Sequence, residues 1–379
     1  MSNGEGLAAL AGLVVVSGAA LIASHRGGGL DGLEGRVSRD EDNLAAEKLD
    51  EDTVRALLEA GRRPKARAAV NPLPPRPAPR ALAPPPAAPA SHSAPIPVDV
   101  DFDEMDGKNL PVPADLPKWL RTFDVILINT SAGKDSQAML DYVYELAVKG
   151  GVQDRIVAVH CDLGRIEWEG TKALARLQAE HYGLRFEVVR RDRDLLQQVE
   201  HERKKWPSNA CRYCTSDHKT SQVVKLITKL VAEKLAAVVR LGRPVRILNC
   251  LGLRADESPS RAKKPPLSRD GASNSKREVI RWLPIHRWTE AQVWAQIRKS
   301  GVEHHYAYDL GMPRLSCCFC VLASKSALML AVQHNPALAD EYIRVERAIG
   351  HRFTDKYSFE DVVEAARKAK VVKVDAWVG

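Results

Sequence analysis

The stretch that decides the fold is DVILINTSAGKDS, residues 124–136, where an apolar run passes directly into a short loop of small and polar residues. The apolar run, residues 124–129, predicts a buried β-strand, and the pattern of residues 137–149 predicts a helix. A strand, a tight loop and a helix in this order point backbone amides and a helix N-terminus at one place, where an anion binds well. We therefore expect residues 131–136 to form a phosphate-binding loop.

The side chains of this loop suit the same purpose. Small residues let the backbone approach an anion, a lysine adds positive charge, and two serine hydroxyls add hydrogen-bond donors. The G-x-x-x-x-G-K spacing of a Walker loop is absent, and a plain strand-to-helix turn is the alternative. The catalytic candidates are Lys134, Asp135 and Ser136, and the nucleotide-binding candidates of the loop are Ser131, Ala132 and Gly133.

The chain around this loop alternates between strand and helix patterns. Further strands are predicted at residues 155–160, 186–190 and 246–251, and helices at 171–182 and 221–239. Such alternation implies βαβ crossovers and an α/β fold with a doubly wound parallel sheet, covered by helices on both faces. After residue 288 the pattern is mostly helical, so a mostly helical C-terminal part is expected.

Polar residues follow the predicted strands, at the edge of the sheet where ligands of open α/β folds bind. Asp162 and Gly164 follow the second strand, and turn chemistry is their alternative explanation. Arg254, Ser258 and Arg261 follow the fourth strand, and guanidinium groups suit phosphate or sulfate because they bind it bidentately. A solvated basic loop is the alternative there. Lys219 opens a predicted helix and could also face a phosphate.

Two C-x-x-C pairs are the second strong signal. Cys211 with Cys214, and Cys317 with Cys320, would complete a tetrahedral zinc site or bind a [4Fe–4S] cluster. Cys318 is an alternative to Cys317 as a ligand, and buried metal-free cysteines are the plain alternative. Seven cysteines, an odd number, argue against a disulfide scaffold. The remaining two, Cys161 and Cys250, fall on predicted strands and are expected in the core.

The first third of the chain differs in composition from the rest. Residues 1–63 contain an apolar segment, 7–23, and a short amphipathic helix pattern, while residues 64–109 form a Pro/Ala-rich linker expected to be disordered. The folded domain is expected over residues 110–379. The apolar segment is either a membrane anchor or a loosely ordered N-terminus. If it is an anchor, the arginines after it predict that the enzyme domain lies in the cytoplasm, and a cytoplasmic location is also expected without an anchor.

These motifs resemble the phosphoadenosine phosphosulfate (PAPS) reductase family of the PP-loop, adenine nucleotide alpha-hydrolase-like superfamily. The loop is similar to the S-G-G-x-D-S loop of that superfamily, with Ala132 in place of the first glycine, and residues 252–261 are similar to the family's G-x-R-x-x-x-S-P-x-R segment. The resemblance implies a Rossmann-like fold, ATP with Mg²⁺ as ligand, and a [4Fe–4S] cluster as in some relatives. Zn²⁺ stays the alternative metal.

The resemblance breaks at the reaction. The family's reductases use a cysteine near the C-terminus, whereas no cysteine follows Cys320 here, and the loop keeps the Lys-Asp-Ser of members that cleave ATP. The first hypothesis is therefore cleavage of ATP to AMP and pyrophosphate, which adenylylates an unknown acceptor, with a sulfur donor protein as a further partner. The alternatives are a sulfonucleotide reductase that uses another thiol, such as Cys318, and a non-catalytic nucleotide-sensing module. A net charge of +8 suits nucleotides and leaves nucleic acid open as a partner.

Overall fold

The computed structural model describes residues 110–239, 242–369, 372 and 374. The apolar segment, the amphipathic helix and the linker predicted within residues 1–109 lie outside the described residues. Within the described ranges, no helix combines the length and the apolar character that crossing a membrane requires.

A six-stranded sheet in the order β3-β2-β1-β4-β6-β5 forms the centre of the domain. All neighbouring pairs are parallel except β5 and β6, which are antiparallel. This arrangement confirms the doubly wound parallel sheet. The strands are β1 (Val125–Thr130), β2 (Ile156–Cys161), β3 (Arg185–Val189), β4 (Val245–Leu251), β5 (Leu267–Arg269) and β6 (Arg277–Trp282).

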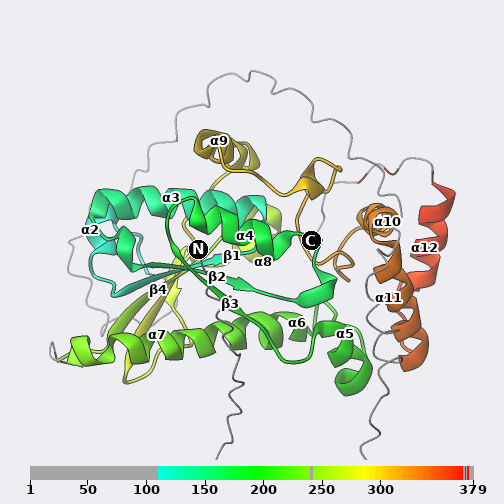
Figure 1. Ribbon diagram of the computed structural model, residues 1–379, viewed down its shortest axis with the longest axis horizontal. Helices are drawn as coiled ribbons and strands as arrows, with labels where there is room; N and C mark the ends of the chain where they lie inside the picture. The colour runs from blue at the N-terminus through cyan, green and yellow to red at the C-terminus, as the bar shows by residue number, and fades with distance from the viewer. Residues whose placement is uncertain (1–109, 240–241, 370–371, 373, 375–379) are drawn as a thin grey trace, which may run out of the picture. The chain divides into compact units, whose positions relative to one another are not determined.

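Helices cover both faces of this sheet (Figure 1). One face packs against α2 (Leu116–Leu120), α3 (Lys134–Gly150), α4 (Thr171–Glu180) and α9 (Glu290–Ser300), and the other against α7 (Ser221–Val239). Alternate residues of β1 explain this: Ile126 and Ile128 face the first set of helices, and Val125 and Leu127 face α7. A strand buried on both faces is continuously apolar, which is why its sequence pattern was so clear.

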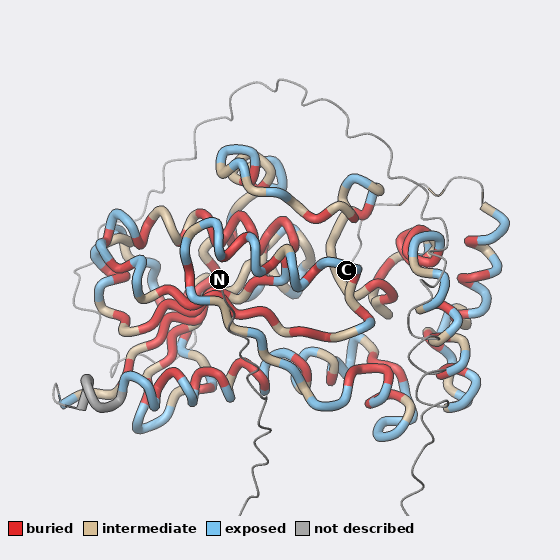
Figure 2. The backbone as a smooth tube through the Cα atoms, viewed as in Figure 1, coloured by how far each residue is buried: buried red, intermediate tan, exposed pale blue. Residues whose placement is uncertain are grey.

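A third hydrophobic core lies beside the sheet, under the C-terminal helices α10 (Lys325–His334), α11 (Pro336–Ile349) and α12 (Phe359–Lys368). Aromatic rings fill it, and Trp206 stacks on Tyr342 with 5.2 Å between ring centroids. Figure 2 shows the buried residues of these helices on the sides that face one another. The predicted helical C-terminal part is thus confirmed.

Short elements join these layers and carry several of the polar residues discussed below. They are η1 (Gln153–Arg155), η2 (Gly164–Ile166), α5 (Leu195–Gln197), η3 (Gln198–Arg203), α6 (Tyr213–Thr215), η4 (Ser216–Thr220), η5 (Ala255–Glu257), α8 (Pro259–Ala262) and η6 (Tyr306–Tyr308).

Candidate functional site at the ends of β1 and β4

The predicted phosphate loop lies at the point where the strand order reverses. From β1 the sheet extends through β2 and β3 on one side, and through β4 and β6 on the other. The loops after β1 and β4 therefore leave the same edge of the sheet in different directions. Such a switch point is where open α/β sheets bind their ligands.

Hydrogen bonds within the loop fix its shape. Ser136 Oγ accepts the N–H of Ser131 at 3.1 Å, donates to the Gly133 carbonyl at 2.9 Å, and lies 3.2 Å from Ser131 Oγ. Ala132 has φ of 57°, in the left-handed region that favours glycine. Ala132, which stands where the family pattern has glycine, is therefore a source of backbone strain. Helix α3 begins at Lys134, three residues earlier than predicted, so its first turn lies within the loop.

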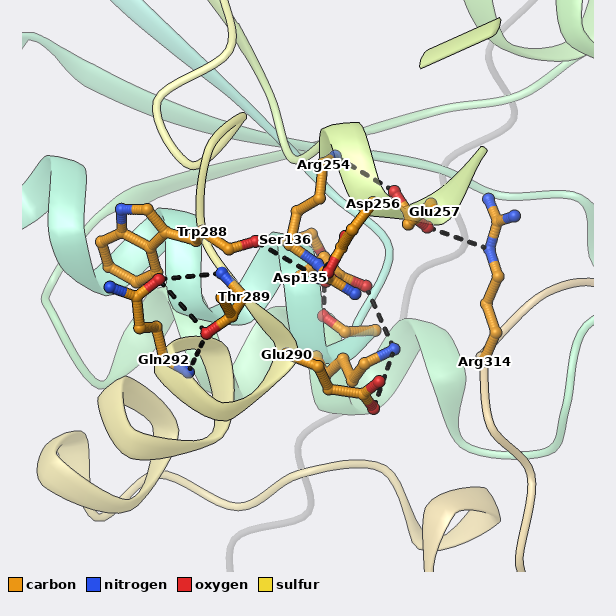
Figure 3. A network of polar contacts seen from close by, with 12 residues as sticks. Asp135, Ser136, Arg254, Asp256, Glu257, Trp288, Thr289, Glu290, Gln292 and Arg314 are labelled. Carbon is orange, nitrogen blue, oxygen red and sulfur yellow. Dashed lines mark hydrogen bonds and ion pairs between the residues drawn. The ribbon is translucent and has the colours of Figure 1, made fainter. Parts of the chain in front are cut away.

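The loop after β4 packs directly on the loop after β1. A Cβ atom on Gly252 would lie 3.0 Å from the carbonyl oxygen of Asp135 and 3.1 Å from Ser136 Cα. Arg254, only 3% exposed, donates from Nε to Asp135 Oδ1 at 2.5 Å and from Nη1 to Asp256 at 2.5 Å (Figure 3). Burial opposes the charge of this guanidinium, but the two carboxylates outweigh burial and raise the pKa of Arg254.

Lys134 is buried in the same network. Its Nζ lies 3.4 Å from Asp135 Oδ2 and 3.8 Å from Glu290 Oε1, and it donates to the carbonyl of Pro313 at 3.1 Å. Figure 3 shows Glu290 at the start of α9, close to Asp135. Sequence reasoning missed Glu290, because an acidic residue in the first turn of a capped helix is ordinary. Three catalytic candidates, Lys134, Asp135 and Ser136, therefore lie together.

Two further arginines share one carboxylate beside this network. Arg261 forms an ion pair with Glu257, and Arg314 Nε lies 3.7 Å from Glu257 Oε1. Burial lowers the pKa of Arg261, and the charge of Arg314 lowers it further. Ser258 acts here as a helix cap, since its hydroxyl accepts the N–H of Arg261 at 3.4 Å. Arg314 was not predicted, because no motif surrounds it.

Asp162 lies at the end of β2, one strand away. Its Oδ1 accepts the N–H of Gly164 at 2.8 Å, and its Oδ2 lies 2.9 Å from Lys172 Nζ and 4.0 Å from Arg190 Nη1. Burial opposes the charge of this carboxylate, but the hydrogen bond from Lys172 and the other donors lower the pKa of Asp162 overall. Gly164 has φ of 70°, as a tight turn requires. Both residues thus stabilise a turn, as their alternative explanation predicted.

Lys219 lies among the cysteines. Its carbonyl accepts the thiol of Cys161 at 4.0 Å. Its ammonium charge acts to lower the pKa values of Cys214 and Cys317, although burial raises both overall, that of Cys317 to about 12. These contacts do not place Lys219 at the phosphate loop, so the prediction that it faces a phosphate is not confirmed.

The two C-x-x-C pairs come together only in part. Cys214, Cys317 and Cys320 are partly buried against the third core. They lie near enough that Cys320 acts to raise the pKa of Cys214, and that Cys320 and Cys214 act to raise the pKa of Cys317, in addition to the effect of burial. Cys211 is exposed, and its N–H donates to Ser208 Oγ at 3.1 Å. Across the described ranges, no three His, Cys, Asp or Glu side chains are grouped so that they could hold a metal ion. The four-cysteine site is thus not confirmed.

The other three cysteines differ in their surroundings. Cys318 is buried, its N–H donates to the Ile166 carbonyl at 2.8 Å, and burial raises the pKa of its thiol. Cys250 is fully buried on β4, as predicted. Cys161 is only partly buried at the end of β2, although burial raises its pKa to about 11. The core position predicted for Cys161 is therefore a position at the edge of the core.

A tyrosine far along the chain also reaches the loop. Tyr308 Oη accepts the N–H of Lys134 at 2.8 Å and that of Leu315 at 3.3 Å. Burial raises the pKa of Tyr308, and the charge of Asp135 adds to this. Sequence reasoning missed Tyr308 because it lies more than 170 residues after the loop and has no motif around it.

Comparisons with known proteins identify relatives of this chain. A family model described as the phosphoadenosine phosphosulfate reductase domain matches residues 125–323. The adenosine 5'-phosphosulfate reductase of Staphylococcus haemolyticus is 26% identical over 203 residues, which cover 53% of this chain and 72% of that protein. An uncharacterized 37.8 kDa protein of Escherichia phage 186 is 28% identical over 178 residues, which cover 46% of this chain and half of the phage protein. The crystal structure of PAPS reductase from Candida auris matches with a TM-score of 0.36 and 19% identity, over 54% of this chain and 86% of that one.

Proposed function

We propose that this chain, which belongs to the phosphoadenosine phosphosulfate reductase family, is an enzyme. In the proposed reaction it cleaves ATP between the α- and β-phosphates. In this reaction a nucleophile of the acceptor attacks the α-phosphorus, the bond to the bridging oxygen breaks, and pyrophosphate leaves with the electron pair. The acceptor becomes adenylylated and is then ready for a second step, such as sulfur transfer, which releases AMP.

The observation that carries this proposal is the convergence of basic groups on the phosphate loop. Lys134, Arg254 and Arg261 come from two loops that meet at the switch point, beside the N-terminus of α3. Phosphoryl and nucleotidyl transfer need positioning and charge stabilisation more than acid–base chemistry. Lys134 and Arg254 would offset the charge that develops on the leaving pyrophosphate.

Carboxylate oxygens, the ligands that Mg²⁺ prefers, are present at the same place. Asp135 and Glu290 both lie near the Lys134 ammonium. Once that ammonium binds phosphate oxygens instead, the two carboxylates would hold the metal. Bound Mg²⁺ would supply further neutralisation of the phosphate charge. The donor set therefore fits a magnesium nucleotide.

The test uses an ATP analogue with a methylene bridge between the α- and β-phosphates, so that binding is measured without turnover. Lys134→Ala should weaken its binding by about 10- to 100-fold, because a hydrogen bond to a charged group contributes about 1.5–3 kcal/mol. Lys149→Ala, an exposed lysine in the last turn of the same helix, is the matched control. Equal affinity of Lys134→Ala and wild type in calorimetry would refute the phosphate-loop assignment. Pyrophosphate release from ATP, measured separately, tests the reaction.

Sulfonucleotide reduction is the second candidate, favoured by the similarity to the Staphylococcus haemolyticus reductase. Its nucleophile is not obvious, because Cys318 is buried and burial raises its pKa, so little thiolate is present near pH 7. Sulfite release from adenosine 5'-phosphosulfate or PAPS with a thiol donor would establish this reaction. Nucleotide binding with neither sulfite nor pyrophosphate release would instead favour a non-catalytic sensing module.

We further infer that Cys211, Cys214, Cys317 and Cys320 hold a [4Fe–4S] cluster, with Zn²⁺ as the alternative. The proximity of the last three supports this, whereas the exposed Cys211 fits only if its loop turns inward. Anaerobic purification with iron and zinc analysis and a visible spectrum tests the inference. Cys214→Ser should abolish the iron absorption and Cys250→Ser should retain it, and Cys211→Ser decides the fourth ligand. Colourless protein with stoichiometric zinc would select the alternative.

The remaining partners stay proposals. They are a sulfur donor protein, the acceptor substrate, nucleic acid, and a membrane bound through residues 7–23 with the enzyme domain in the cytoplasm. Fractionation of cells that express the full chain, compared with a chain that lacks residues 7–23, would test the last of these.

A further inference from the structure

We propose that Tyr308 determines which nucleotides the phosphate loop admits, by occupying the amide that the terminal phosphates of ATP would bind. This inference rests on the proposed function, in which the loop holds the β- and γ-phosphates. It goes further by assigning a role to a residue outside the loop and outside residues 252–261, the arginine segment.

The phenol stands where a phosphate oxygen would stand. Tyr308 Oη accepts the N–H of Lys134, the first residue of α3, at 2.8 Å, and also the N–H of Leu315 at 3.3 Å. The N–H groups of a first helical turn have no partner within the helix, which is what makes them anion ligands. One of these N–H groups, that of Lys134, is therefore already hydrogen-bonded to Tyr308.

The segment around Tyr308 also lies against the loop at other atoms. The carbonyl of Pro313 accepts the Lys134 ammonium at 3.1 Å. A Cβ atom on Gly133 would lie 3.4 Å from Tyr308 Oη and 3.5 Å from Leu315 Cβ, so a side chain added at this position of the loop would contact both residues. A phosphate oxygen that binds the Lys134 amide must therefore displace the phenol.

The ring of Tyr308 is held independently of its hydroxyl. It packs edge-on against Trp294 with 5.2 Å between centroids, and the Tyr308 N–H donates to the His305 carbonyl at 3.1 Å. Removal of the hydroxyl alone should thus leave the segment in place while freeing the amide. A charged phosphate oxygen accepts a hydrogen bond better than a neutral phenol does, so ATP displaces the Tyr308 hydroxyl. The lost hydrogen bond between this hydroxyl and the Lys134 N–H reduces the net free energy of ATP binding.

Two consequences follow for the proposed reaction. A nucleotide whose phosphates do not reach the Lys134 amide, such as AMP, does not compete with Tyr308. Pyrophosphate does compete, so the return of the phenol after cleavage favours release of this product. Tyr308 is therefore a specificity-determining residue that acts on binding and release, and it takes no part in bond breaking.

The experiment compares the binding of inorganic pyrophosphate and AMP, each with Mg²⁺, by calorimetry. Tyr308→Phe should bind pyrophosphate about three- to tenfold more tightly than wild type, the range expected for one competing hydrogen bond, with AMP affinity unchanged. Tyr306→Phe is the matched control, because Tyr306 lies on the same short helix and its ring packs against Trp168 in the third core. Its affinities should equal those of wild type.

Equal or weaker pyrophosphate binding by Tyr308→Phe overturns the inference and leaves the proposed function standing. Failure of both proteins to bind pyrophosphate overturns both. A second measurement avoids the variant altogether: pyrophosphate added to wild type should speed amide hydrogen exchange across residues 305–315. Unchanged or slower exchange there, with pyrophosphate bound, also overturns the inference.

Discussion

Gly252→Ala tests whether the two loops of the site are held by direct backbone packing. The added Cβ would lie 3.0 Å from the Asp135 carbonyl oxygen, and 3.1 Å from the Asp135 carbonyl carbon and from Ser136 Cα. These distances are shorter than the roughly 3.5–4.0 Å optimum for non-bonded atoms. All three atoms belong to backbone, which cannot turn aside as a side chain can. The phosphate loop must therefore move by several tenths of an ångström.

We expect the free energy of unfolding to fall by about 1–3 kcal/mol, the usual cost of overpacking, which lowers Tm by roughly 2–4 °C per kcal/mol in a domain of this size. Nucleotide affinity should fall about tenfold, because the displaced amides no longer point at the phosphates. The control is Gly271→Ala, where an added Cβ meets no atom within 4 Å and the backbone is not left-handed. Urea unfolding and calorimetry measure both effects. Wild-type stability and affinity in Gly252→Ala would refute the packing argument.

Three other predictions follow from buried groups. Arg254→Gln should cost about 3–5 kcal/mol of stability in urea unfolding, because Asp135 loses its strongest partner, and a second change, Asp135→Asn, should recover part of this loss. His305 has its pKa lowered to about 4, by burial first and then by the charge of His304, and its Nδ1 accepts the N–H of Ala307. As the pH falls, His305 of the unfolded chain therefore takes up a proton at a higher pH than His305 of the folded chain. The free energy of unfolding should fall as the pH drops from about 6.5 towards 4, by about 2 kcal/mol at pH 5. His305→Gln should remove this pH dependence. In metal-free protein, iodoacetamide should modify the exposed Cys211 before Cys250 and Cys318, and mass spectrometry that found either buried thiol modified first would contradict the burial described.

The sequence predicted β1 to β4, and the three of them whose side chains are buried on both faces have the clearest pattern. β1, β2 and β4 are nearly continuous apolar runs, and each was found within a residue or two of its observed bounds. β6 was missed because Arg277, Glu278 and Arg281 interrupt its pattern. The structure accommodates them through partners distant in sequence: Arg277 donates to the Ala272 carbonyl and to Thr228, and Glu278 pairs with Arg246 at 3.0 Å.

The residues of the candidate site also fall into two groups, those that the sequence predicted and those that it did not. Groups within the loop and the arginine segment were predictable, because local spacing and strand ends determine where they lie. Glu290, Tyr308 and Arg314 were not, since each reaches the loop from a distant element whose position depends on how α9 and the following segment pack. The cysteines show the limit of spacing alone: the two pairs look alike in sequence, yet Cys211 is exposed while Cys317 is partly buried.

The internal polar contacts of the site also determine how a ligand binds. A buried lysine or arginine cannot be left without a partner, because the desolvation of an unpaired charge is far too costly. The chain meets this requirement with its own groups: Asp135, Glu290 and a carbonyl for Lys134, and Asp135 with Asp256 for Arg254. Binding of a polyphosphate is therefore an exchange of partners, and its affinity is the difference between two sets of contacts. A change in Arg254 should therefore weaken polyphosphate binding, whereas a change in its partner Asp256, which is not one of the proposed metal ligands, should strengthen it.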